Sequence, residues 1–461
     1  MRQGQICIFR KYGVYRWNET CNFKRVRSFI SILALALLSL VALHAQTATQ
    51  STPPAGATAP SSVPVNAPAQ VSGTPLTITD ALTLAEQNSP LLQQAYATVA
   101  RARAGVQTAR AYTNPSAEFL AGNQSARPIT TPGVPGFLEH YSASQTIEIP
   151  RERSMRIQAS QLDEIATRYR LMGIRLSVTA QVKRAFYDVI RRKEQLANAE
   201  SNLALVEDLR RRVGLEVDVG EVGRLELTRA EAELARAQAA VRNADVLLAN
   251  ARAILKAVIG SMSNDTLDAQ GSLGESVQVP ALSELRQQII ANHPAISEAN
   301  ALTARSQTMV EHERAARIPE PTFYGEYERQ PDLTFYRFGV NVPLPLWNRR
   351  VGPIAQAQAE LNMSQAATSQ RRLEITAALE RAYDQYQISN QQVLSLQAGS
   401  LKEAEAAVEA ARSAYRFGER GIVEVLDAQR VLQGVRGDFL DALYARRTAL
   451  IDLEELGVDY Q

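Results

Sequence analysis

The chain has 461 residues, with 50 Lys and Arg against 48 Asp and Glu, which gives a formal net charge of +2. Residues 1–45 hold seven basic residues and one acidic residue, so the rest carries 43 basic against 47 acidic residues, a net −4. This acidic balance argues against a nucleic-acid partner. Cys7 and Cys21 are the only cysteines, so no disulfide, thiolate metal site or thiol nucleophile is expected beyond residue 21.

The N-terminus has the pattern of a secretory signal peptide, which we assign to residues 1–45. Lys24, Arg25 and Arg27 precede 15 mostly apolar residues that end at Leu43, and the small residue Ala45 stands at the break that follows. The apolar run is short for a spanning helix, which needs about 20 residues, and an uncleaved anchor is the alternative. Residues 46–75 contain six prolines and no charge, which predicts a disordered tether.

Folded structure is expected from about residue 76. Thr79 is predicted to cap a short helix, and Ser89-Pro90 a second helix that runs to about Tyr112. The period then changes to alternation, which predicts strands at 116–123 and 140–150 around a loop rich in Pro and Gly. Such strands have the length that a tilted strand needs to cross a bilayer.

The helical period returns after this hairpin and continues at unusual length. Residues 154–213 contain no proline and predict a helix of roughly 90 Å, at about 1.5 Å per residue. A turn rich in glycine should follow, and then a return helix that ends near Gly260.

The same order of predicted elements then repeats in the second half of the chain. Gly220-Glu221-Val222-Gly223 returns 198 residues later as Gly418-Glu419-Arg420-Gly421. The prolines that flank the strands return as well, at 319 and 345. We therefore divide the chain into a first repeat, 76–278, with its hairpin at about 115–150 and its helical tip at about 214–226. The second repeat, 279–461, has its hairpin at about 319–345 and its tip at about 415–427.

The second repeat shows both periods clearly. Tyr336, Phe338, Val340 and Val342 alternate with smaller or polar residues, as in a strand with one apolar face. Residues 354–417 predict the second long helix, and the return helix should end near Gly457. Near the end of this long helix the spacing alternates between three and four residues, which predicts a coiled-coil seam formed by Leu401, Ala404, Val408, Ala411 and Tyr415.

Four amphipathic strands cannot close a barrel, and an open edge cannot lie in lipid because its backbone groups would be unpaired. If the strands lie in a membrane, the chain must therefore form an oligomer. Three chains would supply twelve strands, an even number. A soluble periplasmic coiled-coil scaffold is the alternative of a different class.

In this arrangement the chain resembles the TolC-type outer-membrane factors, the outer membrane efflux protein family. The doubled unit of helix, hairpin, long helix and return helix is that family's plan. Two segments resemble its heavy-metal branch of CzcC- and CusC-like members: residues 144–149 with Arg151 and Arg153, and residues 342–350 leading to Gly352. CusC-like members often carry a lipidated cysteine, which this chain lacks after residue 21.

The resemblance implies a mostly α fold with a small β part. Such a homotrimer has a twelve-stranded outer-membrane β-barrel in contact with lipid and a periplasmic α-barrel. It also implies an exit duct of a tripartite efflux system, with a periplasmic adaptor and an inner-membrane RND pump as partners. The cargo expected from the branch is heavy-metal cations or small toxic compounds. Drug efflux and type I secretion are the alternatives.

The resemblance further places a gate and the docking site for the adaptor at the two glycine-rich turns. Gly220, Gly223, Gly418 and Gly421 would form the turns. Glu226 would pair with Arg420 and Tyr415, while Glu424 and Asp427 would form an acidic ring. Ordinary surface pairs between residues four apart are the alternative reading of these charges.

An enzymatic function is not expected, because the chain has no nucleophile motif and no phosphate-binding loop. His140, His293 and His312 are scattered over 173 residues and do not form a motif for a metal or a cofactor. His293 precedes Pro294 at a predicted helix start, where a capping role is expected.

Overall fold

A computed structural model describes residues 74–125, 136–261, 267–275 and 277–459. The expected signal peptide and the tether up to residue 73 lie outside the described residues. The last residues assigned to the tether are instead part of a short strand, β1 (Thr74–Leu76), which pairs in parallel with β4 (Leu267–Ala269). All described elements belong to one compact unit, Gln70–Gln461.

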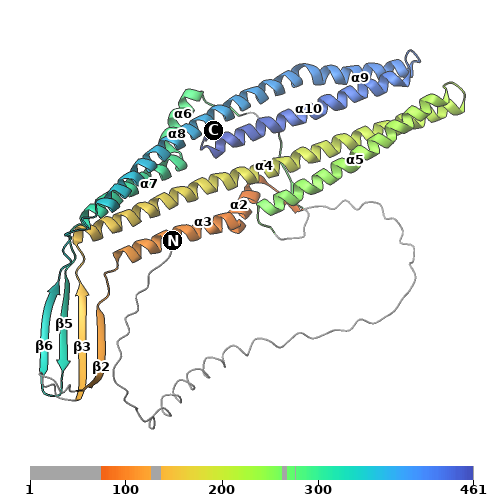
Figure 1. Ribbon diagram of the computed structural model, residues 1–461. Coiled ribbons are helices and arrows are strands. Elements are labelled where there is room, and N and C mark those ends of the chain that lie inside the picture. The colour runs from red at the N-terminus through yellow and green to blue at the C-terminus, as the bar shows by residue number, and fades with distance from the viewer. Residues whose placement is uncertain (1–73, 126–135, 262–266, 276, 460–461) are drawn as a thin grey trace, which may run out of the picture. The chain divides into compact units, whose positions relative to one another are not determined.

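The elements follow one another in the same order twice, as the sequence predicts (Figure 1). The first repeat contains α2 (Ile78–Asn88), α3 (Pro90–Arg110), β2 (Ser116–Gln124), β3 (Gly136–Thr146), α4 (Pro150–Asp218) and α5 (Arg224–Val258). The second contains α6 (Leu282–Asn292), α7 (Pro294–Ala315), β5 (Thr322–Arg329), β6 (Thr334–Asn341), α8 (Val351–Ser395), α9 (Leu401–Arg416) and α10 (Ile422–Glu455). The fold is thus mostly helical with a small sheet.

The two hairpins form one antiparallel sheet in the order β2-β3-β5-β6. Thr146 pairs with Thr322, and that pair ends the ladder between the two repeats. The predicted strand 140–150 is therefore wrong at both ends, because pairing with β2 begins at Gly136 and α4 already begins at Pro150. β2 and β6 remain as the two edges of the sheet.

Helix α4, 69 residues long, is the element around which the helical part is assembled. It packs against α3 and α5 of its own repeat and against α7 and α10 of the other (Figure 1). The largest core cluster lies where these helices meet, with Phe186, Val189 and Leu255 fully buried. The repeats are therefore not independent domains. Within the described ranges, no helix combines the length and apolar character needed to cross a membrane.

Helix caps agree with the sequence in two of three places. Pro90 and Pro294 each occupy a first helical position after Ser89 and His293, as expected, although the Ser89 side chain makes no capping hydrogen bond. The Thr79 prediction is wrong by two residues, because Thr77 is the N-cap of α2. The Thr77 hydroxyl accepts a hydrogen bond from the Asp80 N–H at 3.2 Å, while the Asp80 carboxylate accepts one from the Thr77 N–H at 3.3 Å. This reciprocal arrangement is a capping box.

The second long helix is not continuous, in contrast to the prediction for 354–417. A π-helical turn, η1 (Leu396–Ser400), separates α8 from α9. Leu396 packs against the main core and Leu401 against the core of the second helical hairpin, so two inward-facing leucines are five residues apart. A spacing of five exceeds the α-helical repeat of 3.6, and a π-turn brings both side chains to the same face. The seam beyond it is confirmed, with Ala404 and Val408 buried.

We predict that His293 makes the stability of the second repeat dependent on pH. Its Nδ1 accepts a hydrogen bond from the Ala295 N–H at 3.1 Å. Burial, together with the nearby Arg371, lowers the pKa of His293 below its ordinary value of 6.5. The unfolded chain therefore binds a proton as the pH falls below about 6.5 and the folded chain resists it. This contribution to stability is full above that pH and is lost below it.

The measurement is the thermal midpoint between pH 8 and pH 5 for the detergent-solubilised protein. His293→Asn keeps a capping acceptor without titrating, so it should lose less stability than the wild type on acidification. His293→Ala should cost about 1 kcal/mol at neutral pH through loss of the cap. Equal pH dependence in wild type and His293→Asn would refute the assignment.

Candidate functional site

The two helical hairpins end in turns of identical construction. Gly220 follows α4 with φ = +83° and Gly418 follows α9 with φ = +72°. Each turn carries the two hydrogen bonds of a Schellman motif, including Glu221 N to Glu216 O at 2.8 Å and Glu419 N to Ala414 O at 2.9 Å. These two glycines therefore have the conformational role that the sequence predicts.

Gly223 and Gly421 have a different place in the turns. They are the N-caps of α5 and α10, with φ near −80°. Such an extended backbone is open to any residue, so these two glycines are not required for the chain reversal. Gly remains an acceptable N-cap residue.

An apolar cluster joins the two hairpins just above these turns. It buries side chains from α4, α5 and α10, namely Leu209, Val213, Ala230, Ile422, Val425 and Leu426. Ala411 and Tyr415 of α9 pack against this cluster. The tips of the two repeats are thus held together by contacts within one chain.

Close to the turns, Tyr415 makes a polar contact between the hairpins, but with a residue that the sequence did not suggest. Its hydroxyl donates to the Glu216 carboxylate at 2.6 Å. Burial, the bond to Glu216 and the nearby charge of Glu226 raise the pKa of Tyr415 well above its ordinary value of 10. The phenol is therefore protonated at neutral pH and serves as a donor.

The pairing expected for Glu226 is not formed within the chain. Glu226 binds Arg229 on its own helix at 3.0 Å, and its other carboxylate oxygen is buried without a hydrogen-bond partner. Arg420 lies 4.0 Å from Glu424, also on its own turn. Within the chain, Glu216, one turn before Gly220, is the acid that accepts from the Tyr415 hydroxyl.

Glu216 had a weak signal in the sequence. It stands one position before Val217, the counterpart of Tyr415 at the 198-residue offset. Glu424 and Asp427 lie three residues apart on α10, and both are exposed. Asp427 makes no hydrogen bond or ion pair with the described part of the chain. The roles of these acids and of Arg420 in a gate remain predictions.

The sheet has one apolar and one polar face. Four aromatic residues in register, one from each strand, form a row on the apolar face: Phe119, Tyr141, Tyr327 and Tyr336, with centroids 4.8–6.0 Å apart. On the other face Ser116 bonds to Ser144, Thr146 bonds to Thr322, and Arg337 pairs with Glu326 at 3.0 Å. This division suits a sheet between lipid and water.

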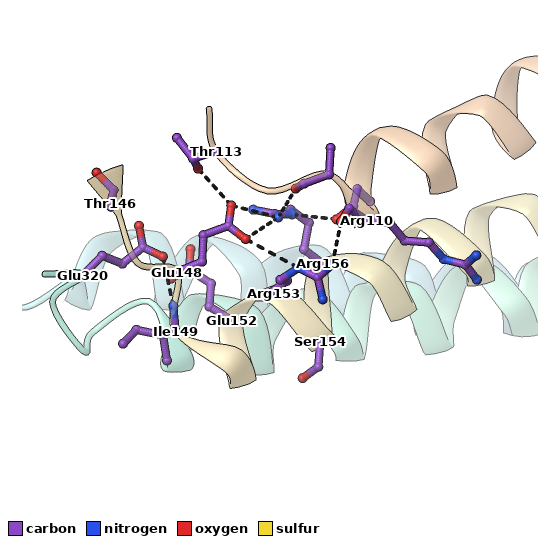
Figure 2. A network of polar contacts seen from close by, with 12 residues as sticks. Arg110, Thr113, Thr146, Glu148, Ile149, Glu152, Arg153, Ser154, Arg156 and Glu320 are labelled. Atoms are coloured by element: carbon purple, nitrogen blue, oxygen red, sulfur yellow. Dashed lines mark hydrogen bonds and ion pairs between the residues drawn. The ribbon is translucent and has the colours of Figure 1, made fainter. Parts of the chain in front are cut away.

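A charged network lies where the strands meet the helices (Figure 2). Glu148, whose side chain is only 6% exposed, accepts hydrogen bonds from Arg156 at 2.9 and 3.1 Å and from the Thr113 hydroxyl at 3.0 Å. Arg153 lies 3.7 Å from the same carboxylate. The hydrogen bond from Arg156 holds the pKa of Glu148 below its usual value, against the opposing effect of burial.

The two arginines of this network also satisfy the end of helix α3. Arg156 donates to the carbonyl oxygens of Ala109 and Ala111, and Arg153 to that of Arg110 (Figure 2). Cations at a helix C-terminus are favourable because the last carbonyls have no partner within the helix. Glu148 and Arg153 thus receive a physical role that the sequence had shown only as a family resemblance.

None of these regions gathers the ligands of a metal. In the parts of the chain that the structure describes, no group of three or more His, Cys, Asp or Glu side chains could hold a metal ion. His312 lies 3.6 Å from Glu152 and Glu313, in the polar layer beside the charged network.

Comparison with known proteins decides what this architecture is. The model of the outer membrane efflux protein family matches residues 81–261 and 285–457, one segment in each repeat. The chain belongs to this family. It is therefore an outer-membrane efflux channel of tripartite systems that extends into the periplasm, not an enzyme and not a soluble scaffold.

Individual relatives agree with the family match. The cobalt-zinc-cadmium resistance protein CzcC of Cupriavidus metallidurans is 28% identical over 390 residues, which cover 84% of this chain and 90% of that protein. The crystal structure of CusC superimposes with a TM-score of 0.73 at 20% identity, over 86% of this chain and 96% of that one. The outer-membrane channel CmeC of Campylobacter jejuni gives 0.71 at 17% identity, over 82% and 85%.

We predict that Glu148 contributes strongly to stability because it neutralises two partly buried arginines. Glu148→Gln should cost about 2–3 kcal/mol, since it leaves their charges uncompensated. The Arg151–Glu311 pair, 3.1 Å long and more exposed, lies in the same layer and provides a control. Glu311→Gln should cost about 1 kcal/mol or less.

The comparison is made by thermal unfolding in detergent at neutral pH and again at pH 4. Because the folded-state pKa of Glu148 is lowered, its contribution is present above its ordinary pKa near 4.5 and is lost as the pH falls further. The difference between wild type and Glu148→Gln should therefore shrink in acid. Equal losses for Glu148→Gln and Glu311→Gln at neutral pH would contradict the prediction.

Proposed function

We propose that three copies of this chain assemble into a single exit duct. The observation that carries the proposal is a four-stranded sheet with one apolar face and two unpaired edges, β2 and β6. In a bilayer the backbone groups of those edges require partners. Pairing β6 of each chain with β2 of the next closes twelve strands, an even number within the bacterial range. Helix α4 would extend the tube by about 100 Å at about 1.5 Å per residue.

The cargo that we propose is heavy-metal cations, with other small toxic compounds as a wider class. The similarity to CzcC supports this choice. The polar face of the sheet supports it too, because it carries Glu118, Glu326 and Glu328 against Arg337. In a closed barrel this face would line the lumen and attract cations. Drug efflux and type I secretion remain the alternatives. We further propose that a periplasmic adaptor docks at the turns around Gly220 and Gly418 and links the duct to an inner-membrane RND pump.

We propose that the tip is also the gate. The Tyr415–Glu216 bond ties the second hairpin to the first within each chain, and three chains supply three such ties. Glu424, Asp427 and Arg420 are exposed near the same turn, where they would meet their counterparts in a trimer. Contacts made by an adaptor would open the tube by replacing these ties, so the tip would act as a two-state element.

The duct is tested by reconstituting the purified protein into planar bilayers. We expect trimers by cross-linking, one conducting pathway per trimer and a reversal potential that favours cations. Glu118→Gln with Glu326→Gln should reduce this selectivity, whereas Glu139→Gln on the apolar face should leave it unchanged. A monomer without conductance would overturn the proposed assembly.

Cargo is tested by the tolerance of cells that lack the protein. Loss of tolerance to cobalt, zinc or cadmium, restored by the wild-type chain, is the expected result. Sensitivity to dyes or drugs with unchanged metal tolerance would overturn the choice of cargo and leave the duct intact.

The gate is tested by leakage through the closed channel. Tyr415→Phe and Glu216→Ala each remove one bond to a charged group, worth about 1.5–3 kcal/mol per chain, and should raise basal conductance at least about tenfold. Arg420→Ser should raise it as well. Glu405→Gln removes a surface pair with Arg436 on the same hairpin, 2.9 Å long, and serves as the control. Wild-type conductance in all three tip variants would contradict the gate.

A further inference from the structure

An apolar stripe continues beyond the end of strand β6. Every second residue from position 336 to position 346 is apolar, with 41–86% of its surface exposed: Tyr336, Phe338, Val340, Val342, Leu344 and Leu346. The strand itself ends at Asn341. The stripe ends at Trp347, which is 93% exposed.

The stripe does not stay extended to its end. The Leu346 N–H donates a hydrogen bond to the Leu344 carbonyl oxygen at 2.9 Å, which closes a tight turn at Pro345. Tyr336 belongs to the aromatic row near the hairpin loops, and Trp347 follows this turn, beside the helices. Aromatic residues thus lie at both ends of the apolar stripe.

The charges beside Trp347 fit a phospholipid surface. Arg350 is paired with Glu313 at 2.6 Å and Arg151 with Glu311 at 3.1 Å. Arg349 is exposed and its side chain has no partner within the described residues. Arg317, before β5 and next to the exposed Ile318, is in the same situation. Unpaired guanidinium groups beside an exposed tryptophan match the phosphate layer of an anionic bilayer.

We propose that residues 344–349 form an interfacial anchor in the periplasmic leaflet of the outer membrane. Leu344, Leu346 and Trp347 enter the boundary between acyl chains and head groups, and Arg349 binds the phosphate of an anionic phospholipid. The first repeat has no such segment, since the position equivalent to Trp347 at the 195-residue offset is Glu152. Each chain therefore has one anchor. The assignment to the periplasmic leaflet depends on the closed barrel of the proposed function, whereas the exposure and the charges do not.

The chain supplies its own probe, because Trp17 and Trp347 are its only tryptophans. In a full-length Trp17→Phe variant, Trp347 is the only source of tryptophan fluorescence. The protein is reconstituted into vesicles of phosphatidylcholine and phosphatidylglycerol in which one lipid or the other is brominated. Acrylamide is added to the water phase, where it quenches tryptophans that are exposed to water. Two controls carry Trp347→Phe with a new tryptophan, either Tyr336→Trp in the aromatic row or Phe417→Trp at the tip.

We expect brominated lipid to quench Trp347 about as strongly as the tryptophan at 336, and acrylamide to quench only the one at 417. Brominated phosphatidylglycerol should quench Trp347 more than brominated phosphatidylcholine, and Arg349→Gln should abolish that preference. Quenching by acrylamide alone would overturn the anchor. Emission insensitive to both quenchers would also overturn it and would show that a neighbouring copy covers the segment.

Conductance recorded on the same vesicles separates this inference from the proposed function. Lipid quenching without conductance would leave the anchor standing and refute the duct. Conductance without lipid quenching would refute the anchor alone.

Discussion

The two unpaired edges of the sheet are the constraint on which the rest of the structure depends. One repeat gives two strands and one chain gives four, which is too few to close a barrel, so β2 and β6 leave backbone groups without partners. In water such edges can be hydrated, but in the hydrocarbon layer they cannot. In the assembly that we propose, another copy of the chain supplies those partners, and the helices that continue from the strands take on the symmetry of the barrel.

At the boundary between strands and helices, the surroundings of the protein change from lipid to water within a few residues. The strands turn apolar side chains outward, whereas the helices turn charged ones outward. Glu148 lies at this boundary with Arg153 and Arg156, and the two arginines bond to the last carbonyl oxygens of α3 (Figure 2). On the outer surface the same boundary carries Trp347 and Arg349. The Glu148 network holds the strand ends to the helices, and the proposed anchor at Trp347 and Arg349 would set how deeply the sheet lies in the membrane.

Much of this architecture was readable from the sequence because it rests on local periodicity. Alternation located both hairpins, the 3.6 period located the long helices, and the 198-residue offset matched the two turns. The errors have physical causes. Strand β3 was displaced by four residues at each end because its limits are set by its partners β2 and β5. The π-turn was missed although the five-residue step from Leu396 to Leu401 signals it.

The contacts of the tip were the least predictable, because they join residues about 200 positions apart. Tyr415 was recognised as a participant, but its partner depends on how α4 and α9 lie against each other, and Glu216 rather than Glu226 faces the hydroxyl. The Glu148 network had the same difficulty. Glu148 and Arg153 stand in a segment that resembles the family, whereas Arg156 and the helix end that the two arginines cap became visible only in the fold. Periodicity specifies which face of an element is buried, but not which neighbour it meets.

The π-turn in the second repeat has a consequence for how two copies of one unit acquired different roles. One additional residue in a turn rotates everything beyond it by about 100° around the helix axis. Helix α4 continues without interruption to its turn. Helix α9 follows the π-turn, so its side chains are rotated around the helix axis relative to those of α8. The second copy can therefore direct a different set of side chains inward at its tip while the turn itself, with Gly418 in place of Gly220, stays the same. A single inserted position in the shaft would be enough to break the equivalence of the two halves.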